Sequence, residues 1–401
     1  MRKVVLLAAF AAFALSSYAQ RTRPSADEEK SPYVFTDVKV NGATEAKSQG
    51  RAGTCWSFGT MAMIESEAIK NGKGSHDFAE MWIVRNTYFN KAVKYVRMHG
   101  INNLAQGGNA HDLTDVIAEY GLVPEEVYPG LNYGAPSHVH GELEAVIAAY
   151  CEAVVQNKNR GLTTAWKDGL NGILDAYFGV KPEKFTYQGK EYTPMSFAEA
   201  MGIDPTNYVS ITSFTHHPFY TAFPVEIQDN WAWKPSYNVP LDEFEAILDE
   251  AVNGGYTVSW GSDVSEKGFA YNKGFAVLPE TNIESIDNLE KAKWVSLSPA
   301  EMEAQMYKFD KVVPEVKVTQ EWRQDGFDRY TTTDDHGMQI YGIAKDQNGN
   351  KFYKVKNSWG DDHVMKGSFY ASEAFVLGKT INYLVNKNAL SAATKAKLGI
   401  K

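Results

Sequence analysis

Cys55 has the sequence setting of a catalytic nucleophile. It lies in a Gly-Thr-Cys-Trp-Ser-Phe run, directly before an apolar stretch compatible with a helix. A cysteine at a helix N-terminus lies at the positive end of the helix dipole, which favours the nucleophilic thiolate over the thiol. Gln49, upstream in the same run, is placed to donate an amide N–H where an oxyanion would form. We therefore predict a reactive cysteine here.

A reactive thiol needs an imidazole partner, and the sequence offers one downstream. His336 stands in an Asp-Asp-His-Gly-Met run and Asn357 in a Lys-Asn-Ser-Trp-Gly run. The imidazole takes the thiol proton and later protonates the leaving amine. A side-chain amide oxygen, as in Asn357, can orient that imidazole. Together the three residues predict covalent catalysis.

These motifs, in this order, resemble those of the papain-like cysteine peptidases. The resemblance implies that Cys55 is the nucleophile, His336 the base and acid, and Asn357 the residue that orients His336. It also implies that Gln49 donates to the oxyanion and that Trp359 shields the hydrogen bond between His336 and Asn357 from water.

The spacing of the motifs narrows the family. Cys55 and His336 are 281 positions apart (336 − 55), whereas the ordinary papain pattern has about 130–150. The chain looks like the bleomycin hydrolase and aminopeptidase C group. That resemblance implies an α+β fold of two lobes, a helical one with the nucleophile helix and a β-rich one with the histidine and asparagine. It also implies large, mainly helical insertions, which we place at about residues 130–250 and 265–330.

The same resemblance implies how substrate is held. Gly107 and Gly108 are expected to line the cleft wall, where only glycine lets the backbone approach an extended substrate. The alternative is an ordinary glycine-rich turn. A C-terminal arm, residues 391–401, is expected to enter the cleft, so that the free carboxylate of Lys401 pairs with the substrate's α-amine. The alternative is a frayed helical tail.

Composition limits the chemistry further. The chain has only two cysteines, Cys55 and Cys151, which does not fit a scaffold held by many disulfides. A single disulfide between them is the alternative, and it would abolish thiol catalysis. The neighbouring His216 and His217 point different ways on a helix or strand, so we expect a structural or interface role for them and no metal. No phosphate-binding, dinucleotide or zinc motif is present, and we expect no cofactor.

The N-terminus has the pattern of an exported protein. Residues 1–19 combine basic residues, an apolar run and a small-x-small cleavage site, so they predict a signal peptide, with an uncleaved anchor as the alternative. Residues 20–31 read as a disordered leader. We expect a periplasmic or secreted protein without a stable membrane anchor. The formal net charge of −9 argues against nucleic-acid binding.

Apolar periodicity and turn residues predict the elements that position the candidate site. Helices are expected at residues 58–72, 81–96, 112–120, 142–155, 164–177 and 241–252. Residues 256–260 predict a strand, and residues 339–344 and 351–356 a hairpin around an Asn-Gly turn. Because His336 enters this hairpin and Asn357 leaves it, we expect the two to meet. We treat residues 32–401 as one peptidase domain.

These observations favour a cysteine aminopeptidase that acts on peptides through a thioester, in a homo-oligomer that the resemblance implies to be a hexamer. Two alternatives stay open: an endopeptidase or acyltransferase on the same fold, and a catalytically silent papain-like binding protein. Labelling of Cys55 by a thiol-reactive epoxide separates the last from the others. Comparison of free with N-blocked peptides separates the aminopeptidase from the endopeptidase or acyltransferase.

Overall fold

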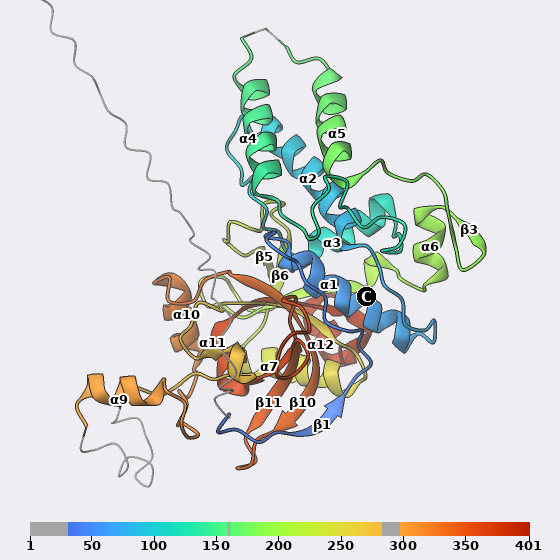
Figure 1. Ribbon diagram of the computed structural model, residues 1–401. Coiled ribbons are helices and arrows are strands. Elements are labelled where there is room, and N and C mark those ends of the chain that lie inside the picture. Colours follow the sequence, from blue (N-terminus) through green and yellow to red (C-terminus); the bar gives the residue numbers. More distant parts are fainter. Residues whose placement is uncertain (1–30, 159–160, 283–296) are drawn as a thin grey trace, which may run out of the picture. The chain divides into compact units, whose positions relative to one another are not determined.

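The computed structural model describes residues 31–158, 161–282 and 297–401, and residues 31–401 form one compact unit (Figure 1). The predicted signal peptide and all but the last residue of the predicted leader lie outside the described residues. In the described part of the chain, no helix is long and apolar enough to cross a membrane.

The first helical layer is built around α1 (Cys55–Lys70), which is buried on nearly all sides. It packs against α2 (Glu80–Arg97) and α3 (Ala110–Tyr120), both within a residue or two of the predicted bounds. An Asn109–Asp112 capping box fixes the start of α3. The predicted helix behind the cysteine is confirmed, and it begins at Cys55 itself.

The predicted first insertion, residues 130–250, divides into two kinds of structure. Its first half adds α4 (Gly141–Val155), α5 (Ala165–Phe178), the hairpin of β2 (Phe185–Tyr187) and β3 (Lys190–Tyr192), and α6 (Pro194–Ala200), all packed on the α1–α3 core. In Figure 1, α4 and α5 stand side by side. Its second half adds η1 (Pro205–Asn207), then β4 (Tyr208–Thr212), β5 (Ala222–Pro224) and β6 (Pro235–Asn238), and then α7 (Leu241–Asn253). The expectation of a mainly helical insertion is therefore wrong for residues 208–238, because this stretch extends the main sheet.

One mixed sheet runs through the second lobe in the order β5-β6-β4-β13-β7-β10-β11-β12-β9-β8, and β1 (Thr36–Val40) pairs with β10. Its other strands are β7 (Val258–Ser262), β8 (Phe269–Ala270), β9 (Phe275–Ala276), β10 (His336–Lys345), β11 (Lys351–Lys356), β12 (Ser368–Ser372) and β13 (Thr380–Asn386). The predicted hairpin is β10–β11, closed by a turn in which Gly349 has a φ of 87°. That positive φ explains the glycine of the Asn-Gly turn.

The central strands separate α1 from α7. On one face of β7, the Ser259 hydroxyl lies 2.8 Å from the Thr60 hydroxyl of α1. On the other face, Trp260 is buried in an apolar cluster with Phe244 of α7. The alternation of neighbouring residues along a strand thus assigns the nucleophile helix and α7 to opposite faces.

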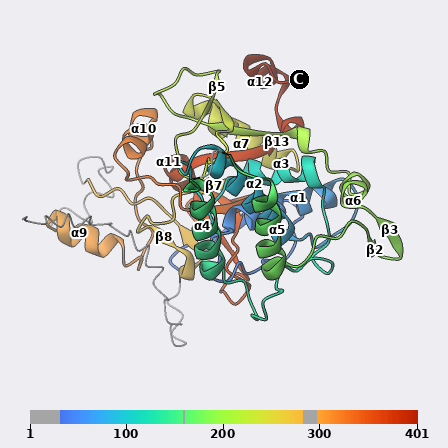
Figure 2. The same ribbon diagram turned by 90° about the horizontal axis from the view of Figure 1, so that it is seen from above.

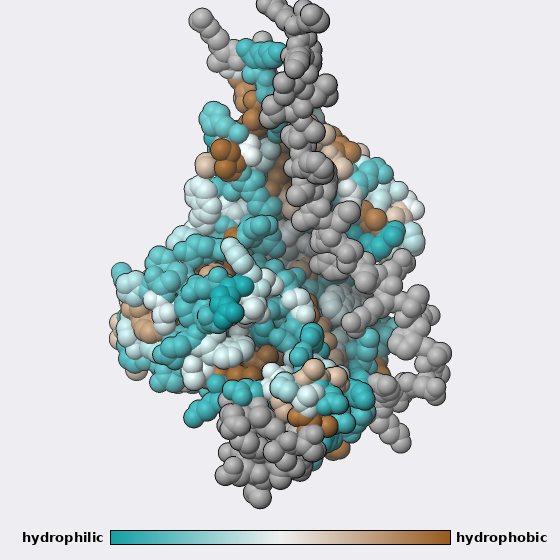
Figure 3. Space-filling model, turned by 90° about the vertical axis from the view of Figure 1, so that its left-hand side faces the viewer, coloured by the Kyte–Doolittle hydropathy of each residue, from teal (hydrophilic) through white to brown (hydrophobic). Residues whose placement is uncertain are grey.

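The remaining helices are α9 (Pro299–Met306), α10 (Gln320–Asp328), α11 (Glu373–Lys379) and α12 (Ala392–Leu398), with short 3₁₀ turns η2 (Tyr271–Lys273) and η4 (Lys387–Ala389). Figure 2 shows α12 beside α7 and apart from α1. Figure 3 faces the side of the molecule on which α9 and α10 lie, and hydrophilic residues predominate on it.

Candidate active site

Cys55 is the first residue of α1, as its sequence setting predicts, and the residue is partly exposed. Burial raises the pKa of the Cys55 thiol to about 12. Hydrogen bonding from the backbone N–H groups of Gly337 and Trp56 opposes that rise. The charges of Asp229 and Asp334 add to it. Desolvation of the thiol therefore opposes the thiolate that the helix terminus favours.

His336 opens β10 and meets Asn357, as predicted. Its Nε2 lies 2.7 Å from Asn357 Oδ1, which also accepts the Ser358 N–H at 2.7 Å. An oxygen that accepts from two sides requires a proton on His336 Nε2, which leaves Nδ1 unprotonated as the base. Burial lowers the pKa of His336 to about 4, although the hydrogen bond that His336 donates to Asn357 and the charge of Asp335 oppose the shift.

Two glycines let β10 approach the start of α1 closely. A Cβ on Gly337 would lie 2.9 Å from Trp56 Cα, and a Cβ on Gly59 would lie 2.7 Å from the Met338 nitrogen. Real side chains do not fit at such distances from a backbone. Because Gly337 directly follows His336 and its N–H interacts with the Cys55 thiol, this close packing is what brings the histidine to the cysteine.

Gln49 is buried and held by the loop that carries Asn357. Its Nε2 donates to the Ala52 carbonyl at 2.7 Å, and its Oε1 accepts the Ser358 hydroxyl at 2.6 Å. Its backbone N–H donates to the Ser358 carbonyl at 2.9 Å. A primary amide has a second Nε2–H. The structure therefore joins Gln49 to the His336–Asn357 pair and fixes the direction of its amide.

Trp359 covers the histidine. Its ring centroid is 4.9 Å from that of His336, and the rings of Tyr271 and Phe269 pack on it at 5.0 and 6.0 Å. Trp359 is 42% exposed, whereas His336 and Asn357 are buried. The exposed indole thus lies between solvent and the His336 side chain, where the sequence places a shield.

Gly107 and Gly108 lie beside the nucleophile, but their neighbours are not those of an open wall. A Cβ on Gly108 would lie 2.8 Å from the Trp56 indole, and a Cβ on Gly107 would overlap the Asp229 carboxylate. The ammonium of Lys91, buried beneath them, donates to the carbonyls of Ala105 at 2.6 Å and Gly107 at 2.5 Å. Close packing requires glycine at both positions. The Gly107 carbonyl, an acceptor of the expected cleft wall, already accepts a hydrogen bond from Lys91.

The structure does not bring Lys401 to Cys55. Leu398 of α12 is buried in the apolar cluster of α7, and Lys397 Nζ lies 2.7 Å from Glu243 Oε1 on α7. Lys401 is exposed. The predicted arm in the cleft is thus corrected: apolar contacts of the terminal helix hold the chain end on the face of the sheet opposite α1.

Three residues near the site were not assigned a role from sequence: Asp229, Asp334 and Lys91. Asp334 is visible in the run before His336, so its position was a usable signal. Asp229 lies on the connection between β5 and β6, 174 positions after Cys55 (229 − 55), in no recognisable motif. Cys55 and Cys151 are both free thiols, which removes the disulfide alternative.

Comparison with known proteins agrees with this geometry. The chain matches the family model described as Peptidase C1-like family over residues 5–301 and 296–400. It is 24% identical over 408 residues to Aminopeptidase C of Lactococcus lactis subsp. cremoris, covering 91% of this chain and 86% of the relative. It is 23% identical to Aminopeptidase G of Lactobacillus delbrueckii subsp. lactis, covering 89% and 83%.

The fold has a solved counterpart. The crystal structure of pepw from Lactobacillus rhamnosis HN001 superposes with a TM-score of 0.66 at 18% identity, covering 91% of this chain and 84% of that chain. At this identity the likeness establishes the two-lobed fold. With the family match over most of the sequence, and with His336 hydrogen-bonded to Asn357, the chain belongs to the Peptidase C1-like family and is a cysteine peptidase.

Proposed function

We propose that this protein is an aminopeptidase that removes N-terminal residues from peptides through a thioester on Cys55. The observation that carries the chemistry is the hydrogen bond from His336 Nε2 to Asn357 Oδ1, because it leaves Nδ1 free to accept the thiol proton. The relatives named Aminopeptidase C and Aminopeptidase G support the choice of an exopeptidase.

In the first half of the reaction, His336 Nδ1 takes the proton of Cys55 and the sulfur attacks the carbonyl carbon of the substrate's first residue. The carbonyl oxygen becomes an oxyanion, stabilised by the second Nε2–H of Gln49 and the backbone N–H of Cys55. When the oxyanion collapses, the C–N bond breaks and the amine leaves with the proton held by His336. The product is a thioester and a shortened peptide.

In the second half, His336 removes a proton from water, and the resulting hydroxide adds to the thioester carbonyl. Collapse of this intermediate breaks the C–S bond and returns the proton to the Cys55 sulfur. The free amino acid leaves. Because each proton that His336 accepts is passed on within the cycle, the reaction needs no cofactor to balance protons or electrons.

An endopeptidase on the same fold is the main alternative, and product analysis separates the two. Wild-type protein is incubated with a peptide whose α-amine is free and with its N-acetylated twin, and products are identified by mass spectrometry. We expect stepwise loss of residues from the free peptide only. Cleavage of both peptides at the same internal bond would contradict the proposal. Cys55→Ala is the control for contaminating peptidases.

We further propose that the protein is exported, with residues 1–19 removed as a signal peptide, and that it works as a homo-oligomer, a hexamer by family resemblance. The basic, apolar and small-residue pattern of that segment supports export. N-terminal sequencing of protein from a periplasmic fraction tests the first part. Light scattering of the mature chain tests the second, and a monomer at all concentrations would refute it.

A further inference from the structure

The Asp229 carboxylate lies against the Cα of Gly107, a residue that we expect to line the substrate cleft. A Cβ on Gly107 would overlap both carboxylate oxygens of Asp229. The side chain is held there from one side, since the Asn103 amide donates to Asp229 Oδ1 at 3.0 Å and to the Gln228 carbonyl at 2.9 Å. Substrate residues upstream of the scissile bond therefore meet a fixed negative group instead of open backbone.

The Gly107 carbonyl is also in contact with a buried cation. It accepts a hydrogen bond from the Lys91 ammonium, which uses one of the two lone pairs of the oxygen. Pairing of an extended peptide with an enzyme backbone depends on donors and acceptors along that edge. Gly107 therefore meets an extended peptide with its Cα covered by Asp229 and its carbonyl shared with Lys91.

Asp334, in the β-rich lobe, is a second carboxyl group whose charge bears on the nucleophile. It lies two residues before His336, and its charge acts on both the Cys55 thiol and Asp229. Burial and these like charges raise the pKa of Asp334 above its ordinary range, and burial raises that of Asp229. Lys91, whose charge also reaches Asp229, is committed to two carbonyls. Among the residues that the structure describes, neither Asp229 nor Asp334 forms an ion pair within 4.0 Å, and Lys91 acts on Asp229 only through its charge.

We propose that Asp229 and Asp334 hold the α-ammonium group of the substrate and so restrict cleavage to the first peptide bond. This inference rests on the aminopeptidase function proposed above and names the residues that select the substrate's free N-terminus. Within one residue the α-nitrogen and the carbonyl carbon are only about 2.5 Å apart. If Asp229 and Asp334 bind the substrate's ammonium group, the carbonyl carbon of the first residue lies at the Cys55 sulfur. A peptide with a further residue before the scissile bond would then collide with Asp229.

The bound ammonium also has a chemical consequence for the nucleophile. In the free enzyme the two carboxylates disfavour a negative charge on the Cys55 sulfur. A cation bound between them cancels that effect and stabilises the thiolate that attacks. Substrate with a free N-terminus therefore activates the thiol, whereas an N-acetylated peptide, which carries no positive charge there, does not.

The test compares Asp229→Asn and Asp334→Asn with wild type on an aminoacyl-coumarin substrate and its N-acetylated form. Each variant is expected to lower kcat/KM for the free-amine substrate about 10- to 100-fold, the loss of a charge-assisted hydrogen bond, and to leave the acetylated form unchanged or faster. Asp310→Asn, an exposed aspartate away from the site, is the matched control. Circular dichroism checks that each variant is folded.

A second measurement does not depend on turnover. The pH dependence of Cys55 alkylation by iodoacetamide should shift to lower pH in both variants, because removing a nearby negative charge lowers the thiol pKa. Suppose that wild type cleaves free-amine substrates, but both variants keep the wild-type ratio of kcat/KM for free-amine and N-acetylated substrates and the wild-type alkylation profile. The inference about the two aspartates is then wrong, and the proposed aminopeptidase function stands. If wild type fails to cleave free-amine substrates, the proposed aminopeptidase function fails instead.

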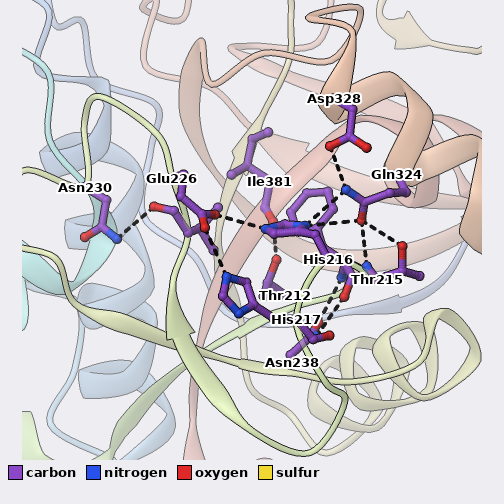
Figure 4. Close-up of polar contacts among 12 residues, drawn as sticks. Thr212, Thr215, His216, His217, Glu226, Asn230, Asn238, Gln324, Asp328 and Ile381 are labelled. Carbon is purple, nitrogen blue, oxygen red and sulfur yellow. Dashed lines mark hydrogen bonds and ion pairs between the residues drawn. The ribbon is translucent and has the colours of Figure 1, made fainter.

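A separate observation concerns the surface cluster of His216, His217 and Glu226, shown in Figure 4. His216 Nε2 lies 3.0 Å from Glu226 Oε2, and His217 Nε2 lies 3.1 Å from Glu226 Oε1. One ligand atom from each residue lies within 4.8 Å of the others. The sequence analysis expected the neighbouring histidines to point apart, but both ring nitrogens contact Glu226, which follows β5.

The two rings are oriented from behind. The Gln324 amide of α10 contacts His216 Nδ1 at 3.1 Å and is itself held by Asp328 at 2.8 Å. The His217 ring stacks on Phe223 at 4.0 Å, and the Asn238 amide donates to the His217 carbonyl at 2.9 Å. Such outer contacts are what direct histidines onto a metal ion.

We infer that this cluster binds a divalent transition metal, with Zn²⁺ the best match. Two imidazole nitrogens and a carboxylate are a ligand set that zinc accepts at about 2.0–2.1 Å each, with a remaining position open to solvent. Glu226 and Asp229 lie on the same connection between β5 and β6. A bound ion would therefore brace the segment that carries Asp229 to the cleft.

Titration with Co²⁺ and Zn²⁺ tests this site, in a Cys55→Ser background so that the catalytic thiol does not bind the ions. We expect one Co²⁺ site with visible d–d absorption that Zn²⁺ displaces. His216→Ala, His217→Ala and Glu226→Gln should each weaken binding about 10- to 100-fold. His99→Asn, an exposed histidine elsewhere, should not. Absence of binding, or equal binding by Glu226→Gln, means that the cluster is only a hydrogen-bonded surface group.

Discussion

The hydroxyl of Ser358 donates a hydrogen bond to Gln49 Oε1 at 2.6 Å, which joins the oxyanion donor to the loop that orients the histidine. Because Asn357 and Ser358 are adjacent, one loop sets both His336 and Gln49. The catalytic groups of the two lobes are therefore positioned together, and a change at Ser358 should be felt at Gln49.

Gln49→Ala should lower kcat by about 10²- to 10³-fold with a smaller effect on KM, since the amide stabilises charge only in the transition state. Ser358→Ala leaves the amide present but loosely oriented, so we expect a smaller loss of about 2- to 10-fold. Steady-state kinetics on a free-amine substrate measures both. An unchanged kcat in Gln49→Ala would remove this residue from the oxyanion site.

His140 should make the protein less stable in acid. Burial lowers the pKa of His140 to about 3, below its ordinary 6.5, so the unfolded chain binds one more proton between these values. The contribution of neutral His140 to the free energy of unfolding is fully present above pH 6.5 and is lost as the pH falls toward 3. In His140→Phe the free energy of unfolding should depend less on pH, by about 1.4 kcal/mol per pH unit between pH 4 and 6. Denaturant unfolding at several pH values measures this slope, and equal slopes would contradict the prediction.

Gly59→Ala should disturb the contact between α1 and β10. Its Cβ would lie 2.7 Å from the Met338 nitrogen and 2.8 Å from the Gly337 carbonyl carbon, so the strand must move. We expect a loss of about 1–3 kcal/mol in unfolding free energy and a fall in kcat as His336 shifts. Gly172→Ala on α5 is the matched control, because its Cβ meets no atom within 4 Å. Thermal denaturation that ranks the two variants equally would contradict the packing argument.

Deleting residues 396–401 should cost stability and leave specificity unchanged. The deletion removes the buried Leu398 and the ion pair of Lys397 with Glu243. Burial of one leucine is worth about 1.5–3 kcal/mol. The truncated protein should still reject N-acetylated peptides, because the carboxylates near Gly107 are retained. If it instead accepts blocked peptides at the wild-type rate for free ones, the chain end does reach the cleft.

The sequence predicted the catalytic residues that lie at the ends of helices and strands recognisable from local pattern. Cys55 begins a helix with its own periodicity, and His336 and Asn357 flank a hairpin with a recognisable turn, so their meeting followed from local pattern. Asp229 could not be found this way, because the packing of β4, β5 and β6 onto the sheet, rather than any neighbouring residue, carries it to Gly107. The desolvation that raises the pKa of Cys55 was likewise out of reach, since it depends on how the folded chain packs around the thiol.

The clearest error came from the chain end. The tail after Leu390 is short, basic and weakly apolar, and nothing in its pattern distinguishes a cleft from the surface of α7. Leu398 holds the tail against α7 by packing into the apolar cluster of that helix, which lies more than 140 positions earlier in the chain. Such long-range pairing is a property of the folded core and not of the tail.

The central claim is that hydrolysis passes through an acyl group on Cys55, and trapping that group tests it most directly. Wild-type protein is mixed with an amino acid ester, quenched in acid within the first turnover, digested, and examined by mass spectrometry. We predict that the peptide containing Cys55 gains the mass of one aminoacyl group, while Cys55→Ala gains none and is inactive. An unmodified Cys55 during rapid turnover, or activity retained by Cys55→Ala, would contradict the account.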